Sequence, residues 1–297
     1  MTLPSSPASI SLSQVNVELG LTASAAITMN DAAVRTLFGV GGSGTAISMS
    51  QGYGKSNQFA FTISANQTNA NLRTLAVNAG WSQSGKVIAT IGSGVYISSN
   101  ATGTPGLTVD GSFPGGVDLI NNGFIIGMGG AGGAGSNAGA NGAAGGAGGL
   151  ALSVSVAVTV TNNGTIGGGG VGGGGGGAFQ STPVPPYYIS LYSAGGGGGG
   201  GRTGATNSSA GAGGAGGIGV AAGTAGGAGT SGSAGAGGAG GSSAGAGGAG
   251  GDWGSAGASG TTANFFSGGA GGSAGAAITG NSNITYSATG TRLGAIT

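Results

Sequence analysis

Hydrophobic residues in the first half of the chain form short runs that alternate with polar and glycine-rich segments. Four of these runs are rich in β-branched or aromatic residues and are bounded by Gly, Asn, Ser or Pro, which is typical of β-strands. They are residues 59–63, 87–91, 95–97 and 107–109. Residues 92–94 read Gly-Ser-Gly between two of the runs and indicate a hairpin. The pattern predicts a small antiparallel β-domain over residues 59–126.

The segment before this domain contains two short helical patterns. Residues 12–19 precede Gly20, which suits the glycine stop of a helix. Asn30 can cap a second helix over residues 31–38, with Asp31 in its first turn and Gly39 after its end. Neither helix buries much surface alone, so we expect residues 1–58 to gain stability by docking on something else.

One phrase recurs at the start of the glycine-rich tracts. Residues 118–127 read DLINNGFIIG, residues 158–167 read VTVTNNGTIG, and residues 278–284 are a looser echo after the last tract. Asn and Gly tolerate positive φ, so Asn-Asn-Gly turns the chain sharply after each strand. The pattern of strand, turn, strand and long glycine run suggests one architecture used repeatedly.

The tracts themselves have a period of three. The chain contains 80 glycines among 297 residues, and because glycine has no side chain to bury, these tracts cannot form a hydrophobic core. Glycine also loses more backbone entropy on folding than any other residue. Collagen would need abundant proline, which these tracts lack. Polyproline II geometry has three residues per turn and no internal hydrogen bonds, so neighbouring helices must satisfy each other's backbone groups. A polyglycine II bundle is therefore predicted, with a flexible linker and a sheet or fibre as the alternatives.

In a helix with three residues per turn, residues three apart lie in one column along its surface. Within such a bundle, glycine must occupy the columns where helices face each other. Tracts with one Ala column, such as Ala236 and Ala239, are expected at the surface. The nearly pure glycine of residues 167–177 and 195–201 is expected inside.

Charge and residue types exclude several classes of function. Charged residues make up 4% of the chain, against about 25% in an ordinary domain. The net charge is +1 without a basic cluster, which disfavours nucleic acid as a partner. The absence of His and Cys removes imidazole, thiolate and zinc chemistry, and we expect no cofactor or metal. The longest apolar stretch, residues 150–160, is too short for a membrane span of about 20 residues.

Loops that interrupt the glycine tracts carry the candidate binding residues. The interruptions are residues 178–194, 202–209 and 252–267, where aromatic and small polar residues meet. Rigid aromatics with small polar neighbours are typical of a binding surface, although the same aromatics could instead cap the ends of the bundle. The candidates are Phe179, Tyr187, Tyr188, Tyr192, Arg202, Asp252, Trp253, Phe265 and Phe266.

The sequences of several segments resemble those of phage virion proteins. The phrase at 119–127, running into glycine tracts, is similar to the receptor-recognition adhesins at the tips of T-even-type bacteriophage long tail fibres. Residues 10–20 and 27–37 resemble a segment that recurs in tailed-phage virion proteins, and residues 281–286 and 290–295 are also phage-like. The resemblance implies a polyglycine II sandwich whose distal loops bind a bacterial surface receptor. It carries over no individual contact residue, because such loops vary.

The expected fold class is mostly β and irregular. We expect a virion-attachment segment with short helices at 1–58, a β-domain at 59–126, a polyglycine II bundle with variable end loops at 127–280 and a C-terminal strand at 281–297. Residues 1–58 would attach to other phage tail or fibre proteins, and a homotrimer is one option for the assembly.

The leading functional hypothesis is a phage adhesin for a protein or glycan receptor, located in the virion tail or tail fibre. No secretory signal is visible at the N-terminus, so synthesis in the host cytoplasm is expected. The main alternative is a purely structural tail-tip or fibre subunit with the bundle as a rigid spacer. A glycine-rich bacterial surface protein is a weaker alternative. An enzyme acting through Asp110 and Asp118 is the weakest, because their spacing gives no reason to pair them, so the chain is expected not to be an enzyme.

Overall fold

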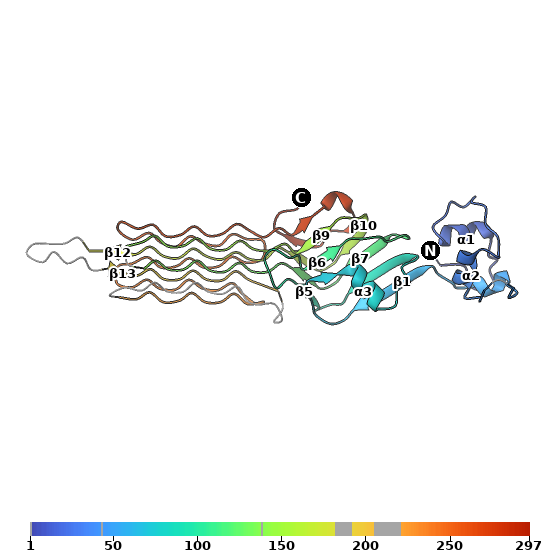
Figure 1. The fold of residues 1–297 in the computed structure, drawn as a ribbon, viewed down its shortest axis with the longest axis horizontal. Coiled ribbons are helices and arrows are strands. Elements are labelled where there is room, and N and C mark those ends of the chain that lie inside the picture. Colours follow the sequence, from blue (N-terminus) through green and yellow to red (C-terminus); the bar gives the residue numbers. More distant parts are fainter. Residues whose placement is uncertain (1, 43, 138, 182–191, 205–220) are drawn as a thin grey trace, which may run out of the picture.

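The computed structural model describes residues 2–42, 44–137, 139–181, 192–204 and 221–297. The molecule is elongated and has three parts in a row (Figure 1). An N-terminal lobe lies at one end, a body of β-strands lies in the middle, and long parallel tracts of glycine-rich chain extend to the other end. The C-terminus lies beside the middle body, close to where the tracts begin.

The N-terminal lobe (residues 2–57) contains the two helices expected from the sequence. Helix α1 spans Leu12–Glu18, helix α2 spans Ala32–Phe38, and a short 3-10 helix, η1, spans Met49–Gly52. Asp31, and not Asn30, occupies the N-cap position of α2, and Gly39 ends that helix with φ 70°. The lobe has a small core of its own, made of Leu3, Val15, Val34, Leu37 and Phe38.

The middle body is a parallel β-helix, in which the chain coils repeatedly through three sheets. The first sheet contains β1 (Gln58–Ile63), β4 (Lys86–Ile91), β7 (Val117–Asn121), β10 (Val158–Asn162) and β15 (Ile284–Ala288). The second contains β2 (Gln67–Thr68), β5 (Tyr96–Ser98), β8 (Phe124–Ile126), β11 (Thr165–Gly167) and β16 (Thr291–Leu293). The third contains β3 (Ala70–Asn71), β6 (Leu107–Val109), β9 (Leu152–Val154) and β14 (Ile278–Thr279), and the short helix η2 (Asn281–Asn283) leads from β14 to β15.

The prediction of an antiparallel β-domain is therefore wrong. Every pairing within the three sheets is parallel, for example β4 with β1 and with β7. Residues 92–94 do not form a hairpin, because β4 and β5 belong to different sheets. A short turn rich in glycine bends a strand into the next sheet of a coil as readily as it reverses the strand, so the local sequence does not separate the two outcomes.

Alternating side chains explain why these segments become strands around one core. Val87, Ala89 and Ile91 of β4 are fully buried. The first two pair in register with Val117 and Leu119 of β7. Helix α3 (Leu72–Asn78) interrupts the first coil and was not predicted; the Asn71 side chain caps it, and Leu72 and Ala76 are buried. The aliphatic interior is the one large side-chain core among the described residues.

Buried asparagines hold one corner of the β-helix. The Asn121 side-chain amide donates to Asn162 Oδ1 at 2.7 Å, and the Asn162 amide donates to the backbone oxygen of Thr289 at 2.8 Å. Asn121 Oδ1 accepts from the backbone N–H of Gly123 at 3.1 Å. The recurring Asn-Asn-Gly phrase is thus a corner between the first and second sheets, stacked from one coil to the next.

The glycine-rich tracts are two insertions in the β-helix. One leaves after β8 and returns at β9, and the other leaves after β11 and returns at β14. Their backbones run side by side as extended, wavy lines (Figure 1). We call them the glycine bundle; its described tracts are residues 128–136, 141–149, 168–177, 194–203, 221–230, 234–241, 245–252, 256–262 and 267–276.

Hydrogen bonds around the central tract 168–177 show how the glycine bundle is held together. Three successive residues, 172–174, bond to six different tracts. Their N–H groups donate to the carbonyl oxygens of Gly146, Gly199 and Ala258, at 3.0, 2.8 and 2.9 Å. Their carbonyl oxygens accept from the backbone N–H groups of Gly272, Gly133 and Gly248, at 3.1, 2.8 and 2.8 Å. This is hexagonal packing of helices with three residues per turn, the polyglycine II arrangement.

Burial follows the columns of the tracts. All residues from 166 to 178 are buried, as are those from 193 to 201. Ala236, Ala239 and Ala249 are exposed. The interior of the glycine bundle is therefore largely backbone against backbone, and the side chains of these three Ala residues face water.

Candidate functional site

The end of the glycine bundle farthest from the N-terminal lobe is formed by turns from separate segments (Figure 1). We call residues 178–181, 192–194, 241–244 and 261–267 the distal end. Strands β12 (Phe179–Gln180) and β13 (Tyr192–Ser193) pair here in antiparallel register. A tight turn, in which Ala263 and Phe266 exchange backbone hydrogen bonds of 3.0 and 2.8 Å, lies beside them.

An exposed aromatic ring stands on this turn. Phe265 is 64% exposed, which is the largest exposed fraction of any large hydrophobic residue in the described part of the chain. The next residue, Phe266, is half-buried, and so is Phe179. An apolar ring held in water is the kind of group that a partner can bury with a gain in free energy.

Side-chain amides fix this turn to its neighbours. Asn264, with φ 31°, donates from Nδ2 to the backbone oxygen of Gln180 at 2.8 Å. Asn141 Oδ1 accepts from the backbone N–H of Ser267 at 2.9 Å. These contacts tie the Phe265 turn to β12 and to a second tract, so the ring is presented from a firm support.

The opposite end of the glycine bundle is locked onto the β-helix. We call Arg202, Thr203, Asp252 and Trp253 the base clamp. The Arg202 guanidinium lies 3.6 Å from the centre of the Trp253 ring, within cation–π range. It also pairs with Asp252 at 2.8 Å. Trp253 Nε1 donates to the Thr203 carbonyl oxygen at 2.8 Å, and the residue is only 6% exposed.

Aromatic contacts extend the base clamp into the second sheet. Trp253 lies 6.0 Å from Phe124 of β8, centroid to centroid, and Phe124 stacks on Tyr96 of β5 at 4.3 Å. Burial opposes ionisation of Asp252, but hydrogen bonds from Arg202 and from the Trp253 backbone outweigh it and lower the pKa of this carboxyl. The charged form of Asp252 is thus the one that supports the clamp.

The structure divides the nine candidate residues between the two ends. Phe179, Phe265 and Phe266 lie at the distal end, as does the backbone of Tyr192. Arg202, Asp252 and Trp253 lie together in the base clamp. Tyr187 and Tyr188 lie outside the described residues.

Sequence reasoning missed several residues at both ends. Asn264, Gln180 and Asn141 support the distal turn, and Thr203 with Phe124 supports the base clamp. A signal was present for Asn264, because Asn precedes Phe-Phe in a tract otherwise made of small residues. None was present for Phe124, whose link to Trp253 depends on the fold.

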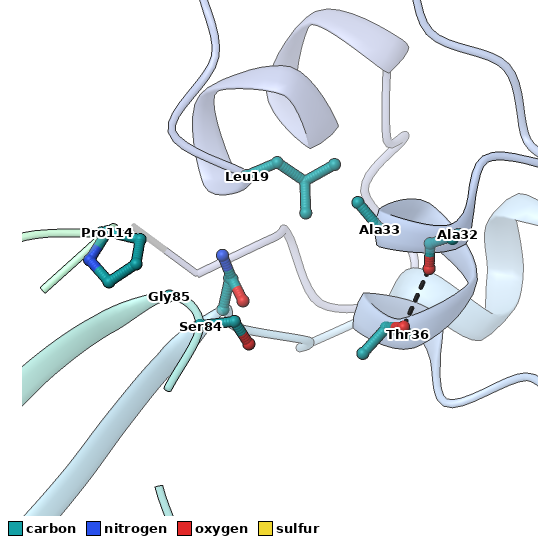
Figure 2. Close-up of a pocket in the computed structure, with 9 residues that line it drawn as sticks. Leu19, Ala32, Ala33, Thr36, Ser84, Gly85 and Pro114 are labelled. Carbon is teal, nitrogen blue, oxygen red and sulfur yellow. Dashed lines mark hydrogen bonds between the residues drawn. The ribbon is translucent and has the colours of Figure 1, made fainter. Parts of the chain in front are cut away.

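A cavity of about 370 Å³ lies where the N-terminal lobe meets the β-helix. Leu19 and Ala33 face Pro114 and Ser84 across it, and Thr36 donates from its hydroxyl to the Ala32 carbonyl at its rim (Figure 2). Its lining residues carry no carboxylate, amine or imidazole. This chemistry suits packing between the two parts better than catalysis.

Asp110 and Asp118 lie at different sheets of the β-helix and have separate partners. Asp118 pairs with Lys86 at 2.6 Å on the first sheet, whereas Asp110 accepts from the Asn71 amide at 2.6 Å beside the third sheet. Within the described ranges no group of three His, Cys, Asp or Glu residues could hold a metal ion. Among the helices described, none is long and apolar enough to cross a membrane.

Comparison with solved structures gives a similar fold. The chain matches a structure described as the gp37-gp38 adhesin tip complex of the bacteriophage S16 long tail fibre, with a TM-score of 0.53 and 22% sequence identity. The match covers 89% of this chain and 91% of the other. Among curated proteins, no relative matches.

A family model identifies the larger part of the chain. The model of the phage tail fibre adhesin Gp38 matches residues 58–297, which comprise the β-helix and the glycine bundle. The N-terminal lobe precedes the matched region. Adhesins of this family are tail components of the virion. The chain therefore belongs to the Gp38 family of phage tail fibre adhesins and acts as a receptor-binding adhesin of the phage tail.

Proposed function

We propose that the distal end of the glycine bundle is the surface that contacts the receptor on the bacterial cell. The observation that carries this proposal is the 64% exposed Phe265 ring, on a turn anchored to β12 through Asn264. Exposed aromatics on a rigid support bind with little loss of conformational entropy. The position also fits, because the distal end lies opposite the N-terminal lobe (Figure 1).

The candidate residues take two roles in this proposal. The residues proposed to contact the receptor are Phe179, Tyr187, Tyr188, Tyr192, Phe265 and Phe266. Arg202, Asp252 and Trp253 are proposed to hold the glycine bundle on the β-helix, since Trp253 is almost fully buried there. The protein acts in this proposal by binding alone, without a catalytic step.

The N-terminal lobe is proposed to attach the protein to another tail or fibre protein. Leu12, Val17 and Leu21 are 40%, 40% and 45% exposed, so α1 and the turn after it offer apolar surface to a partner. The similar S16 protein is described in a complex of gp37 with gp38 in a long tail fibre. A fibre subunit is accordingly the partner expected for residues 1–58.

Competition for phage adsorption tests the proposed receptor surface. Purified protein is added to host cells before phage, next to the variants Phe265→Ser and Leu293→Ser. Leu293 is 37% exposed on β16 and serves as the matched apolar control. The native protein and Leu293→Ser should block adsorption, and Phe265→Ser should block it at least tenfold less well. Equal blocking by all three, with circular dichroism unchanged, would contradict the proposal.

A further inference from the structure

The charges of this chain lie in the N-terminal lobe, the β-helix and the base clamp, and none lies at the distal end. Its six basic and five acidic residues leave three long stretches without any charge. These stretches are residues 119–201, 203–251 and 253–291. The three stretches include every residue of the distal end. They also include residues 182–191 and 205–220, so the absence of charge is a property of the sequence and does not depend on where those segments lie.

The charges nearest to the distal end along the glycine bundle lie in the base clamp. Arg202 and Asp252 are paired with each other at 2.8 Å, so their fields largely cancel at a distance. Tract 194–203 connects them to the distal end, and a rise of about 3.1 Å per residue places that end roughly 25–30 Å away. The screening length at physiological salt is about 8 Å, so the distal end feels almost no field from the rest of the protein.

The groups that remain at the distal end are apolar rings, hydroxyls and amides. Phe265 is exposed, Asn264 and Gln180 bond to each other, and Ser242 is exposed on the neighbouring turn. A surface that binds phosphate or carboxylate groups would carry Arg or Lys for charge-assisted hydrogen bonds. This surface has none to offer.

We propose that the distal end recognises an uncharged epitope on the cell surface and makes no ion pair with its receptor. This inference rests on the proposed function and names the chemistry of the partner. Phosphate groups of the cell surface are therefore not the determinant of recognition. Binding comes from burial of aromatic surface and from neutral hydrogen bonds.

Salt dependence separates this mode of binding from an electrostatic one. Association with a charged partner is steered by the field and slows steeply as ionic strength rises, whereas a neutral surface associates at an unassisted rate. Cell binding of the purified full-length protein is measured at 20, 150 and 500 mM NaCl. The apparent dissociation constant should change less than about twofold, and vesicles of phosphatidylglycerol, which carry phosphate but no glycan, should not compete.

A charged variant checks that the assay can detect the effect. Ser242→Lys places one positive charge on the exposed turn, and its binding to the anionic cell surface should become salt-dependent, whereas Ser242→Thr should behave as the native protein does. A tenfold or larger loss of native binding at 500 mM NaCl, or competition by the phosphatidylglycerol vesicles, would overturn this inference and leave the receptor-binding role intact. Failure to bind cells at every salt concentration would overturn the proposed function and this inference together.

Discussion

The β-helix and the glycine bundle are held together in opposite ways, although one chain passes back and forth between them. In the β-helix, aliphatic side chains such as Leu119 and Ile125 are fully buried in a common core. In the glycine bundle, the buried positions 172–174 have no side chain and bond to six surrounding tracts through their backbone. Hydrophobic burial stabilises the first region, and satisfied backbone hydrogen bonds stabilise the second.

A methyl group therefore has opposite effects on the stability of the two regions. A methyl removed from the β-helix core leaves a cavity. A methyl added inside the glycine bundle meets a neighbouring carbonyl group, because the tracts already touch. Single substitutions can therefore break one region and spare the other.

The largest effect is expected from Leu119→Ala in the β-helix. Leu119 is fully buried and pairs in register with Ala89 and Val160. The lost contacts and the remaining cavity should lower the free energy of unfolding by about 2–5 kcal/mol. Chemical denaturation monitored by Trp81, which is buried in the same core, measures it. A change below ~1 kcal/mol would contradict the side-chain account of this region.

The next effect is expected from Gly173→Ala inside the glycine bundle. A Cβ at this position would lie 2.1 Å from the Gly248 carbonyl oxygen, so the two tracts must move apart. We expect a loss of about 1–3 kcal/mol, confined to the glycine bundle and visible as faster proteolysis of its tracts. Gly232→Ala is the matched control, because its Cβ would have no contact closer than 3.7 Å. Equal behaviour of the two variants would argue against close backbone packing.

The smallest effect concerns Asp252, at the boundary between the two regions. Its folded pKa is lowered, so its contribution to stability is present above the ordinary pKa of an aspartate and is lost as the pH falls through the lowered value. Because the side chain is 62% exposed, this contribution should be about 1 kcal/mol or less.

The variant Asp252→Asn isolates this contribution. It should be less stable than the native protein at pH 7, and the difference should shrink as the pH falls below about 4. Thermal unfolding of both proteins across that range measures the difference. A gap that is unchanged down to pH 2 would show that the ion pair with Arg202 does not support the base clamp.

Much of the glycine bundle could be predicted from the sequence because its geometry is local. A period of three along a glycine tract fixes which columns can face a neighbour, so the exposed position of Ala236 and the buried position of Gly173 follow from spacing alone. The helices around Val15 and Val34 were likewise marked by the glycines that follow them, Gly20 and Gly39.

The direction of the strands could not be obtained in the same way. Parallel pairing of β7 with β10 joins residues 41 positions apart, such as Leu119 and Val160, across the first glycine insertion. The repeated Asn-Asn-Gly phrase was the one indication, since Asn121 and Asn162 stack in adjacent coils. Antiparallel pairing was the simpler expectation for short strands and depended on turns that proved to be corners.

The candidate site was only partly visible for a related reason. Residues 252–267 appeared as one loop, but a glycine tract divides them, which places Trp253 at the base and Phe265 at the distal end. Composition indicates that a residue lies at a turn between tracts. Because successive tracts run in opposite directions, the number of tracts before a turn decides whether that turn lies at the base or at the distal end of the glycine bundle.

Hydrogen–deuterium exchange tests most directly whether backbone hydrogen bonds hold the glycine bundle. Amide protection is compared between tract 168–177 and strand β7, whose amides bond within a sheet. We predict that the central tract exchanges as slowly as β7, and that the exposed turn at 230–233 exchanges much faster. Exchange of tract 168–177 within seconds, while β7 stays protected, would contradict this prediction, because the tracts would then be a flexible linker without a bonded interior.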